Sequence, residues 1–547
     1  MKVSTYIIEF LKKQNVDKAF GVSGGVINNL IHEIGNHQNF EAFHCCSENQ
    51  AVFMAQSYGY QTDSFGVVFC IWGAGQSNMI NGISSAFMEN KKLLIITGSD
   101  SFENFSKYPA QNSTENGVDF MKVLDNMTTY NKIINDKKQV IDSLNQAAYQ
   151  MELFSKPVHI QISKDILNEE ILVTKEIKLI KNEENRISSS NMDFLKNIIK
   201  NKKVNFIIGK NCIDVTESIQ KICLKYQQSI CTTPSGKGLV SERHPNFIGN
   251  FGIATEFDEK TFNNFDYNIF IGDSLSEENT GGWSDSLINQ KMIYINNIIH
   301  ENRIPFDILK NINCGLKETF NELEYNLDCH NVILNDYGYK KRKIKEKNGE
   351  KVNPKDLITF FSNISDNSVS YFDIGNSFLW GIRYWKNYYN IKKKDHNFKI
   401  GTGFGTMGWA LGTSIGHAIS NPNKKIFCFI GDGSILMCSQ EIAMLQNLQL
   451  SIVFVILNDS QLGTIYHGQK MLKSNSLTNS LPVIDFSKMY QSMGIDSIKV
   501  KSIKDLEKNK KHILKTKAPL VIDVHINKEA PPPLDSRIKN LINGSYK

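Results

Sequence analysis

The sequence lacks several features that would place the protein in other structural classes. Its 547 residues contain 10 cysteines, but no two have C-x-x-C spacing, and only Cys45 and Cys46 are adjacent. This usage argues against a disulfide framework or a zinc site, and it favours reduced thiols in a cytoplasmic protein. No run of about 18 apolar residues is present, so no membrane span is expected. The amino-terminal segment lacks the apolar core of a signal peptide.

The sequence also has little excess of charge of either sign. Its formal net charge is +6, and no basic stripe is present. The longest charged run, residues 340–347, is typical of a solvated linker, with an anionic-surface patch as the alternative. We therefore expect neither a nucleic-acid partner nor a membrane partner.

Strand and helix patterns alternate along most of the chain. Short apolar segments rich in β-branched residues predict buried strands of parallel sheets. Polar stretches at 168–191 and 331–353 separate three groups of such segments. The pattern predicts an α/β protein with three doubly wound parallel-sheet domains and a carboxyl-terminal arm. Their expected bounds are 1–167, 190–330, 354–530 and, for the arm, 531–547.

One motif in the last third of the chain carries the strongest chemical signal. Residues 431–434, Gly-Asp-Gly-Ser, follow an apolar strand at 425–430 and precede a predicted helix at 437–448. A second predicted strand, at 451–457, ends in Asn458-Asp459. Glycines let the backbone approach a phosphate, and carboxylate oxygens suit Mg²⁺ or Ca²⁺. No Gly-Lys-Ser/Thr follows, so the loop is not a Walker A motif, and it predicts a metal-bound diphosphate.

This motif resembles the Gly-Asp-Gly…Asn signature of thiamine-diphosphate enzymes, and three other segments fit. Residues 20–25 resemble the Phe-Gly-x-Pro-Gly turn of the acetolactate synthase/pyruvate decarboxylase-like superfamily. Residues 44–59 resemble the family segment that carries the cofactor-activating glutamate. Residues 403–408 resemble the loop that grips the aminopyrimidine. Because these segments occur in family order, the chain is identified as a member of that superfamily.

The resemblance implies which residues hold the cofactor. Glu48 would share a proton with N1′ of the aminopyrimidine and so activate the cofactor; the alternative is an ordinary glutamate at a helix N-terminus. Met407 would enforce the folded cofactor conformation, and the carbonyl of Gly405 would accept from the 4′-amino group. Diphosphate contacts are expected from Gly375, Asn376, Ser377, Gly433 and Ser434. An ordinary strand-to-helix turn is the alternative for residues 375–377.

The resemblance also implies metal ligands and substrate contacts. Asp432, Asp459 and the backbone carbonyl of Gln461 would bind Mg²⁺. Alignment with acetolactate synthases places Asp459 where an asparagine is usual, and it leaves Asn458 in the preceding, non-ligand position. Gly24 and Asn116 are expected near the substrate.

The function implied is a thiamine-diphosphate- and Mg²⁺-dependent carboligase. It would decarboxylate a 2-oxo acid donor such as pyruvate and transfer the acyl-anion equivalent to a carbonyl acceptor, an aldehyde or ketone. Two alternatives stay open: a non-oxidative 2-oxo acid decarboxylase that releases an aldehyde, and a catalytically silent regulatory homologue. The sequence has no adjacent His-His pair of the pyruvate decarboxylase kind, which disfavours the decarboxylase.

Two further expectations concern FAD and assembly. Some family members bind FAD in the central domain, so FAD is possible here, although residues 272–277 replace the usual arginine-containing contact. In this family, one subunit supplies the glutamate and its partner the diphosphate loop. We therefore expect a homodimer or a homotetramer.

Overall fold

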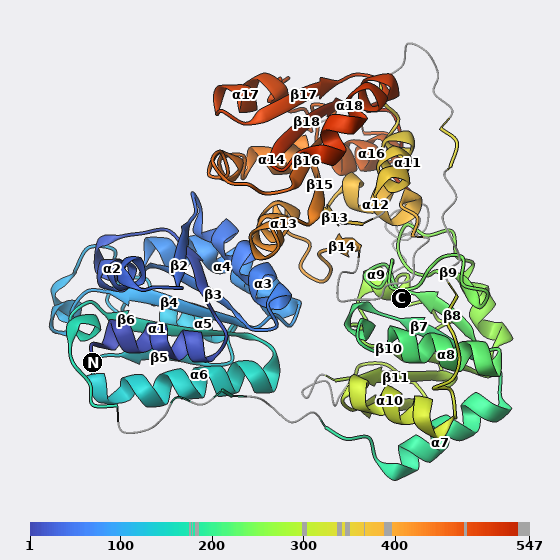
Figure 1. The fold of residues 1–547 in the computed structure, drawn as a ribbon, viewed down its shortest axis with the longest axis horizontal. Helices are drawn as coiled ribbons and strands as arrows, with labels where there is room; N and C mark the ends of the chain where they lie inside the picture. Colours follow the sequence, from blue (N-terminus) through green and yellow to red (C-terminus); the bar gives the residue numbers. More distant parts are fainter. Residues whose placement is uncertain are drawn as a thin grey trace.

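The computed structural model contains three α/β units, each built on a six-stranded parallel sheet with flanking helices (Figure 1). It describes residues 1–173, 177, 179–180, 185–297, 304–335, 342–344, 351–365, 367–387, 397–474 and 479–533. The predicted fold class, with three units of parallel sheet, is confirmed. Of the predicted carboxyl-terminal arm, residues 534–547 lie outside the described residues, as does most of the charged run 340–347.

The first unit has the strand order β2-β1-β3-β4-β6-β5. Its strands are β1 (Lys18–Gly21), β2 (Glu41–His44), β3 (Gly66–Ile71), β4 (Leu93–Ser99), β5 (Asn131–Ile134) and β6 (Pro157–Ser163). Its helices are α1 (Val3–Lys13), α2 (Asn28–Asn36), α3 (Glu48–Gln61), α4 (Ala74–Met88), α5 (Phe120–Asp125) and α6 (Val140–Phe154).

The central unit has the strand order β12-β11-β10-β7-β8-β9. Its strands are β7 (Val204–Ile208), β8 (Ser229–Thr232), β9 (Phe247–Asn250), β10 (Tyr267–Ile271), β11 (Met292–Asn296) and β12 (Lys310–Asn313). Its helices are α7 (Ser189–Asn201), α8 (Thr216–Tyr226), α9 (Glu277–Thr280) and α10 (Leu316–Asn326).

The third unit has the strand order β14-β13-β15-β16-β18-β17. Its strands are β13 (Ser368–Phe372), β14 (Phe398–Ile400), β15 (Lys425–Gly431), β16 (Ile452–Asn458), β17 (Asp496–Val500) and β18 (Leu520–His525). Its helices are α11 (Pro354–Ile364), α12 (Asn376–Tyr384), α13 (Trp409–Ser420), α14 (Asp432–Leu436), α15 (Gln440–Ala443), α16 (Gly463–Met471), α17 (Phe486–Ser492) and α18 (Ile503–Lys515). Among the described helices of the chain, none has the length and apolar character needed to cross a membrane.

The predicted helix at 437–448 is wrong as a single element. A short helix, α14, begins at Asp432 itself, and α15 covers only four residues. Between and after them, the N–H groups of residues 437, 438, 441 and 444–446 bond to carbonyls three residues back. This is the tighter spacing of 3₁₀ turns, which do not continue into a regular α-helix.

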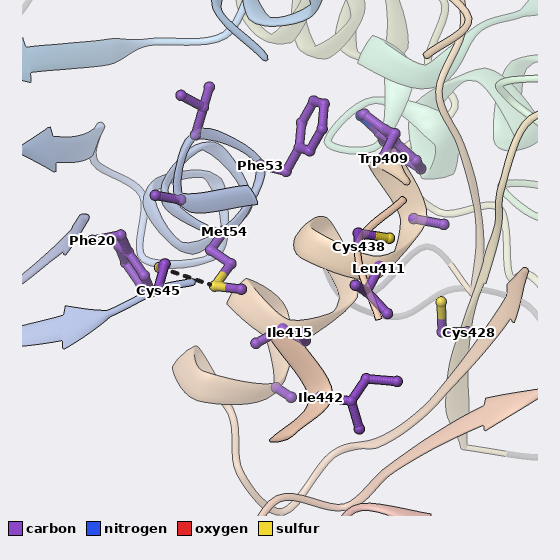
Figure 2. Close-up of a cluster of buried hydrophobic side chains, with 14 of the residues drawn as sticks. Phe20, Cys45, Phe53, Met54, Trp409, Leu411, Ile415, Cys428, Cys438 and Ile442 are labelled. Atoms are coloured by element: carbon purple, nitrogen blue, oxygen red, sulfur yellow. Dashed lines mark hydrogen bonds between the residues drawn. The ribbon is translucent and has the colours of Figure 1, made fainter. Parts of the chain in front are cut away.

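Helix α3 of the first unit packs closely against α13 of the third unit. Figure 2 shows Phe53 and Met54 on one side of this contact and Leu411 and Ile415 on the other. A Cβ atom at Gly416 would lie 2.1 Å from the carbonyl oxygen of Met54, so no larger residue fits there. The first and third units therefore share one continuous apolar core.

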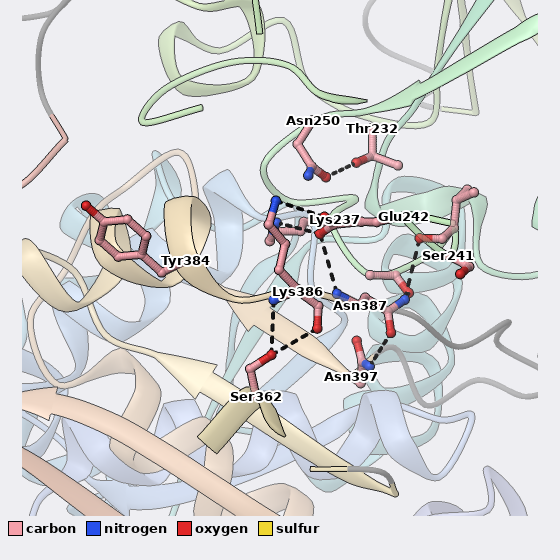
Figure 3. A network of polar contacts seen from close by, with 12 residues as sticks. Thr232, Lys237, Ser241, Glu242, Asn250, Ser362, Tyr384, Lys386, Asn387 and Asn397 are labelled. Carbon is pink, nitrogen blue, oxygen red and sulfur yellow. Dashed lines mark hydrogen bonds and ion pairs between the residues drawn. The ribbon is translucent and has the colours of Figure 1, made fainter. Parts of the chain in front are cut away.

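The central unit is joined to the third unit through a buried ion-pair network (Figure 3). The Nζ atom of Lys237 lies 3.1 Å from Glu242 Oε1, and that of Lys386 lies 2.9 Å from Glu242 Oε2. The N–H of Glu242 donates to the carbonyl of Asn387 at 2.8 Å. The two lysines and their hydrogen bonds offset the desolvation of the Glu242 carboxylate, which keeps the pKa of that carboxyl below its ordinary value despite burial.

Candidate active site

A solvent-open cavity of about 320 Å³ lies at the carboxyl ends of β13, β15 and β16. Ligand sites of parallel sheets occur at this edge, where the loops after the strands converge. Every lining residue belongs to the third unit: Ile374, Gly375, Asn376, Ser377, Trp380, Gly405, Met407, Gly431, Asp432, Gly433, Ser434, Leu457, Asp459, Gln461, Leu462, Gly463, Thr464, Ile465 and Ile526. The predicted diphosphate, metal and pyrimidine-loop residues of this unit therefore meet in one place.

Glycine allows two of the turns that shape this cavity. Gly375 has φ 98° and directly precedes α12, and Gly405 has φ 69°. Side chains rarely adopt such angles, so these positions favour glycine. The turn at 375 leaves the N-terminus of α12 at the cavity, where its N–H groups favour an anion. The Asn376 side chain there accepts a hydrogen bond from Thr464 Oγ1 at 3.0 Å.

The cavity holds two neighbouring carboxyl groups. Asp432 Oδ2 accepts from the N–H groups of Asp459 at 3.1 Å and Ser460 at 2.6 Å, and Oδ1 accepts from Gly433 at 2.8 Å. Burial raises the pKa of Asp432 to about 6 against these hydrogen bonds. Burial, and then the charge of Asp432, raise the pKa of Asp459 to about 7. Two such carboxyl groups favour binding of a cation, which would relieve their mutual repulsion.

The structure separates Asp459 from its neighbour Asn458. The Asn458 amide points away from the cavity and donates to Ile484 O at 3.0 Å and to Asp523 Oδ1 at 2.8 Å. Within the described residues, no group of three or more His, Cys, Asp or Glu side chains is placed to hold a metal. The two aspartates therefore fit Mg²⁺ best if oxygens of a bound diphosphate and a backbone carbonyl complete its coordination.

Asp373 is a site residue that sequence reasoning missed. Its buried carboxylate accepts from the N–H of Gly408 at 3.0 Å and from that of Ala410 at 2.9 Å. Burial raises its pKa to about 6, while these hydrogen bonds lower it. Asp373 thereby anchors the start of α13 and the adjoining loop with Gly405 and Met407. Its position, at the end of a predicted strand and just before the glycine turn, was the available signal.

Glu48 begins α3 and does not line the cavity of Asp432. Its Oε2 atom accepts from Asn78 Nδ2 at 2.8 Å, and only 8 % of the residue is exposed. The nearby Asn81 donates to Thr406 Oγ1 of the third unit at 2.7 Å. The Glu48 carboxyl is thus held on the first unit by α4, the helix whose Asn81 contacts the loop at 405–407.

A second buried carboxyl group, which the sequence did not reveal, lies near Glu48. Glu441 of the third unit accepts from the N–H of Cys46 at 3.2 Å. Burial raises its pKa to about 7; hydrogen bonds from the backbone of Cys46 and Ser47 lower it, and the charge of Glu48 adds to the increase. This proximity depends on the contact between two units, so no local pattern could have shown it.

The predicted substrate residues also lie on the first unit. Gly24 follows β1 and precedes a 3₁₀ turn, and Asn116 lies on an exposed loop after β4. Neither residue lines the cavity of Asp432. Within one chain, the predicted site is therefore divided between the third unit and the edge of the first unit.

The central unit does not fit the diphosphate of FAD at its glycine turn. A Cβ atom at Gly209, directly after β7, would lie 2.2 Å from Asp273 Cβ. Asp273 is 1 % exposed and accepts hydrogen bonds from Thr233 Oγ1 at 2.7 Å, from Ser235 Oγ and from Asn279 Nδ2 at 2.9 Å. Dinucleotide phosphates bind at such turns, and here a carboxylate would repel them.

Comparison with known proteins decides the family. Residues 1–123 match the N-terminal TPP binding domain of thiamine pyrophosphate enzymes, residues 193–318 the central domain, and residues 373–524 the C-terminal TPP binding domain. The chain belongs to the thiamine-diphosphate-dependent enzymes. It is a member of their acetolactate synthase/pyruvate decarboxylase-like superfamily, as the motifs predicted.

The relatives of this enzyme include proteins named as acetolactate synthases and a protein named as a pyruvate decarboxylase. The enzyme is 24 % identical to a probable acetolactate synthase large subunit of Methanococcus aeolicus, over 98 % of this chain and 94 % of that one. It is also 24 % identical to pyruvate decarboxylase 4 of Arabidopsis thaliana, over 82 % and 76 % of the two chains. A solved structure of a putative thiamin diphosphate-dependent enzyme from Mycobacterium smegmatis has the same fold, with a TM-score of 0.80 at 16 % identity, over 96 % and 99 % of the chains.

Proposed function

We propose that this enzyme is a thiamine-diphosphate- and Mg²⁺-dependent carboligase that acts on a 2-oxo acid such as pyruvate. The cavity that joins Asp432, Asp459, Met407 and the glycine turns is the observation that supports this proposal most. When bound, thiamine diphosphate supplies the nucleophilic carbon and the electron sink for loss of CO₂. An aldehyde or ketone would then accept the acyl-anion equivalent that remains after CO₂ is lost.

Each part of the chain would have a separate task. Asp432 and Asp459, with the carbonyl of Gln461, would hold Mg²⁺ against the diphosphate. Gly433, Ser434 and the turn at 375–377 would bind the diphosphate oxygens, with the N-terminus of α12 adding to the attraction. Met407 and the Gly405 carbonyl would orient the aminopyrimidine, and Asp373 would keep their loop in position.

Glu48 would hold a proton shared with N1′ of the aminopyrimidine. Because it does not line the cavity of Asp432 in its own chain, we infer that a second copy supplies it. The active unit would then be a homodimer, or a homotetramer of two such dimers. Gly24 and Asn116 of that second copy would approach the substrate from the same side as Glu48.

We also propose that FAD has no part in the reaction. Asp273 already receives the hydrogen bonds at the place where the FAD diphosphate would lie. Purified enzyme should show no flavin absorbance, and added FAD should not change its activity. Flavin that copurifies with the enzyme would contradict this part of the proposal.

One experiment distinguishes the proposed carboligase from the alternatives. Enzyme, thiamine diphosphate and Mg²⁺ are incubated with a panel of 2-oxo acids, with and without aldehyde or ketone acceptors, and products are identified by mass spectrometry. A hydroxyketone supports the carboligase, whereas a free aldehyde unaffected by acceptors supports the non-oxidative decarboxylase. No loss of CO₂ from any 2-oxo acid, in protein shown to bind the cofactor, would support the silent homologue. The Asp432→Ala variant is the matched control for metal-dependent turnover.

A further inference from the structure

A second cavity lies where all three units meet, away from the cavity of Asp432. The first unit contributes Gln56, Tyr60, Glu89 and Lys91; the central unit contributes Lys210, Asn211 and Ser235; the third unit contributes Tyr371, Phe398, Lys399, Trp409 and Thr413. No lining residue is shared with the proposed active site. We refer to this space as the junction cavity.

The junction cavity carries excess positive charge. Its lining includes three lysines and a single carboxyl group, that of Glu89. Lys91 Nζ lies 4.6 Å from the centroid of the Tyr60 ring, and Lys399 Nζ lies 5.3 Å from the same centroid. Burial, and then the charge of Lys210, lower the pKa of Lys91 to about 8. Cationic side chains are thus gathered around one aromatic ring, at a cost from mutual repulsion.

Two of these lysines, Lys91 and Lys210, share one carboxylate, because the charge of Glu89 interacts with both of them. No hydrogen bond or ion pair is formed by the Nζ of Lys91 or of Lys210 among the described residues. One carboxylate cannot balance the lysines of this cavity, and partly buried charge that is not fully compensated is unfavourable. In the first unit, the neighbouring Lys92 is by contrast paired with Glu152 at 2.6 Å. An anion in the junction cavity would compensate the excess positive charge of its lysines.

A buried amide provides an independent sign of a missing ligand. Gln56 is 3 % exposed, and neither its Nε2 nor its Oε1 atom has a hydrogen-bond partner. Such unsatisfied groups are rare in native interiors and call for a ligand or an ordered water. Gln56 lines the junction cavity, so its amide N–H is available to the same anion as the lysines.

A neighbouring open space gives the ligand room to extend. It shares Gln56, Tyr60 and Lys91 with the junction cavity and continues past Asp63, Asp214 and Asn297. These side chains accept hydrogen bonds, so the part of a ligand that lies here would carry hydroxyl or amino donors.

We propose that the junction cavity binds a phosphate ester. The phosphate would lie between Lys91, Lys210 and the Gln56 amide, and a hydroxylated organic group would extend toward Asn297. Lysine binds phosphate as a compact point charge, which fits this arrangement of ammonium groups. The site borders the glycine turn of the central unit, because Lys210 directly follows Gly209, and its backbone N–H donates to Asp273 Oδ2 at 3.4 Å. Its occupancy would hold the three units together, whatever reaction the enzyme performs.

Binding to the holoenzyme tests the proposal. Enzyme saturated with thiamine diphosphate and Mg²⁺, so that the diphosphate site is filled, is titrated calorimetrically with glycerol 3-phosphate and glucose 6-phosphate. Glycerol and glucose serve as uncharged controls. We expect saturable binding of the esters alone, weakened by salt because the contacts are ionic. At pH 8 binding should take up protons, because an anion raises the pKa of Lys91 from about 8.

Matched variants locate the site. Lys91→Met together with Lys210→Met should lower ester affinity by about tenfold or more, since each contact to a charged group is worth at least one factor of ten. Lys200→Met removes one positive charge at the exposed end of α7, the same change as either single substitution, and should leave affinity unchanged. Equal affinity in wild type and double variant, or no ester binding at millimolar concentration, would overturn the proposal.

Thermal stability without ligand gives a second, independent measurement. Lys91→Met keeps most of the apolar stem but removes a charge that Lys210 repels more strongly than Glu89 attracts, so its melting temperature in anion-poor buffer should equal or exceed that of wild type. Added ester should raise the melting temperature of wild type and of Lys200→Met, but not that of the double variant. A clearly lower melting temperature for Lys91→Met without ligand would show that the lysine serves packing, and would overturn the proposal.

Discussion

The carboxylate of Asp432 accepts a hydrogen bond from the N–H of Asp459 at 3.1 Å, and both side chains line one cavity. Neither aspartate has a lysine or arginine in that lining. Their environment therefore favours a bound cation or a shared proton, and substitution can tell which residue holds the cation.

Asp459 should tolerate asparagine better than alanine. Asparagine retains an oxygen donor and removes one negative charge, so Asp459→Asn should keep Mg²⁺-dependent cofactor binding and substantial activity. Asp459→Ala should lose that binding, whereas Asn458→Ala should be milder because its amide bonds to Ile484 and Asp523. Mg²⁺ titration of cofactor binding measures all three. A larger loss of metal affinity in Asn458→Ala than in Asp459→Ala would assign the ligand to Asn458.

Asp432→Ala should abolish metal-dependent retention of thiamine diphosphate. Without this anchor for the metal, the charge of the diphosphate is left uncompensated. Trp380 lines the cavity, so quenching of tryptophan fluorescence provides a direct titration, with calorimetry as a check. Unchanged cofactor affinity in the presence of Mg²⁺ would contradict the assignment.

Glu48→Gln should leave fold and cofactor binding largely intact while removing most turnover. Glutamine can still accept from Asn78, but it cannot share a proton with the aminopyrimidine. General acid–base contributions of this kind are worth about 10²–10⁴-fold in rate. The rate of exchange of the thiazolium C–H, followed by NMR, isolates this step, and a rate near that of wild type would exclude Glu48 as the activator.

Glu441→Gln should stabilise the protein at high pH and not at low pH. The pKa of Glu441 rises from its ordinary 4.5 to about 7 in the folded protein. The folded state therefore binds its proton more tightly, and stability falls as pH increases from about 4.5 to 7. Above pH 7 the full penalty applies, so the glutamine should gain about 1–3 kcal/mol at pH 8, shrinking to little at pH 4.5. The midpoints of urea unfolding at pH 4.5 and pH 8, compared between wild type and variant, measure this gain in stability.

An exposed glutamate serves as the control for that experiment. Glu507 lies on the outer side of α18, so Glu507→Gln should show no such difference between pH values. A gain for Glu441→Gln that is equal at pH 4.5 and pH 8 would mean that burial of the charge is not the cause.

Gly416→Ala should destabilise the contact between α3 and α13. The added methyl group would lie 2.1 Å from the Met54 carbonyl oxygen, and overpacking of this kind costs about 1–3 kcal/mol. Gly35→Ala, in α2, is the matched control: its Cβ would meet no atom within 4 Å, so the change should be neutral or stabilising. Chemical denaturation compares the two, and equal effects would show that the helices separate without strain.

Much of the architecture followed from local patterns. The apolar runs at 425–430 and 451–457 match β15 and β16 to within one residue at each end, because short β-branched segments have few alternatives in a buried parallel sheet. The glycines and Asp432 could be placed together because loops after adjacent parallel strands share one edge. The helix at 437–448 was wrong since its apolar spacing suited an α-helix, while its backbone forms tight turns.

Local sequence patterns could not predict the contacts between segments that are distant in the chain. Nothing around residue 441 indicates that its carboxyl lies near Glu48, nearly four hundred positions earlier in the chain. The need for glycine at 416 likewise depends on Met54, which belongs to another unit. The lysines of the junction cavity look like ordinary surface residues until the three units are assembled. The surroundings of the Glu441 carboxyl, the packing at Gly416 and the clustering of the lysines depend on position in the tertiary structure rather than on residue type.

The buried Asp273 has a consequence for variation at its position. A variant able to bind a dinucleotide at this turn would have to lose this carboxylate, and an apolar replacement would leave the hydroxyls of Thr233 and Ser235 and the amide of Asn279 without their acceptor. Each buried donor left without an acceptor costs about 1–3 kcal/mol, so Asp273→Ala alone would destabilise the central unit. The hydrogen bonds that Asp273 accepts therefore limit which single substitutions this position of the central unit can accept.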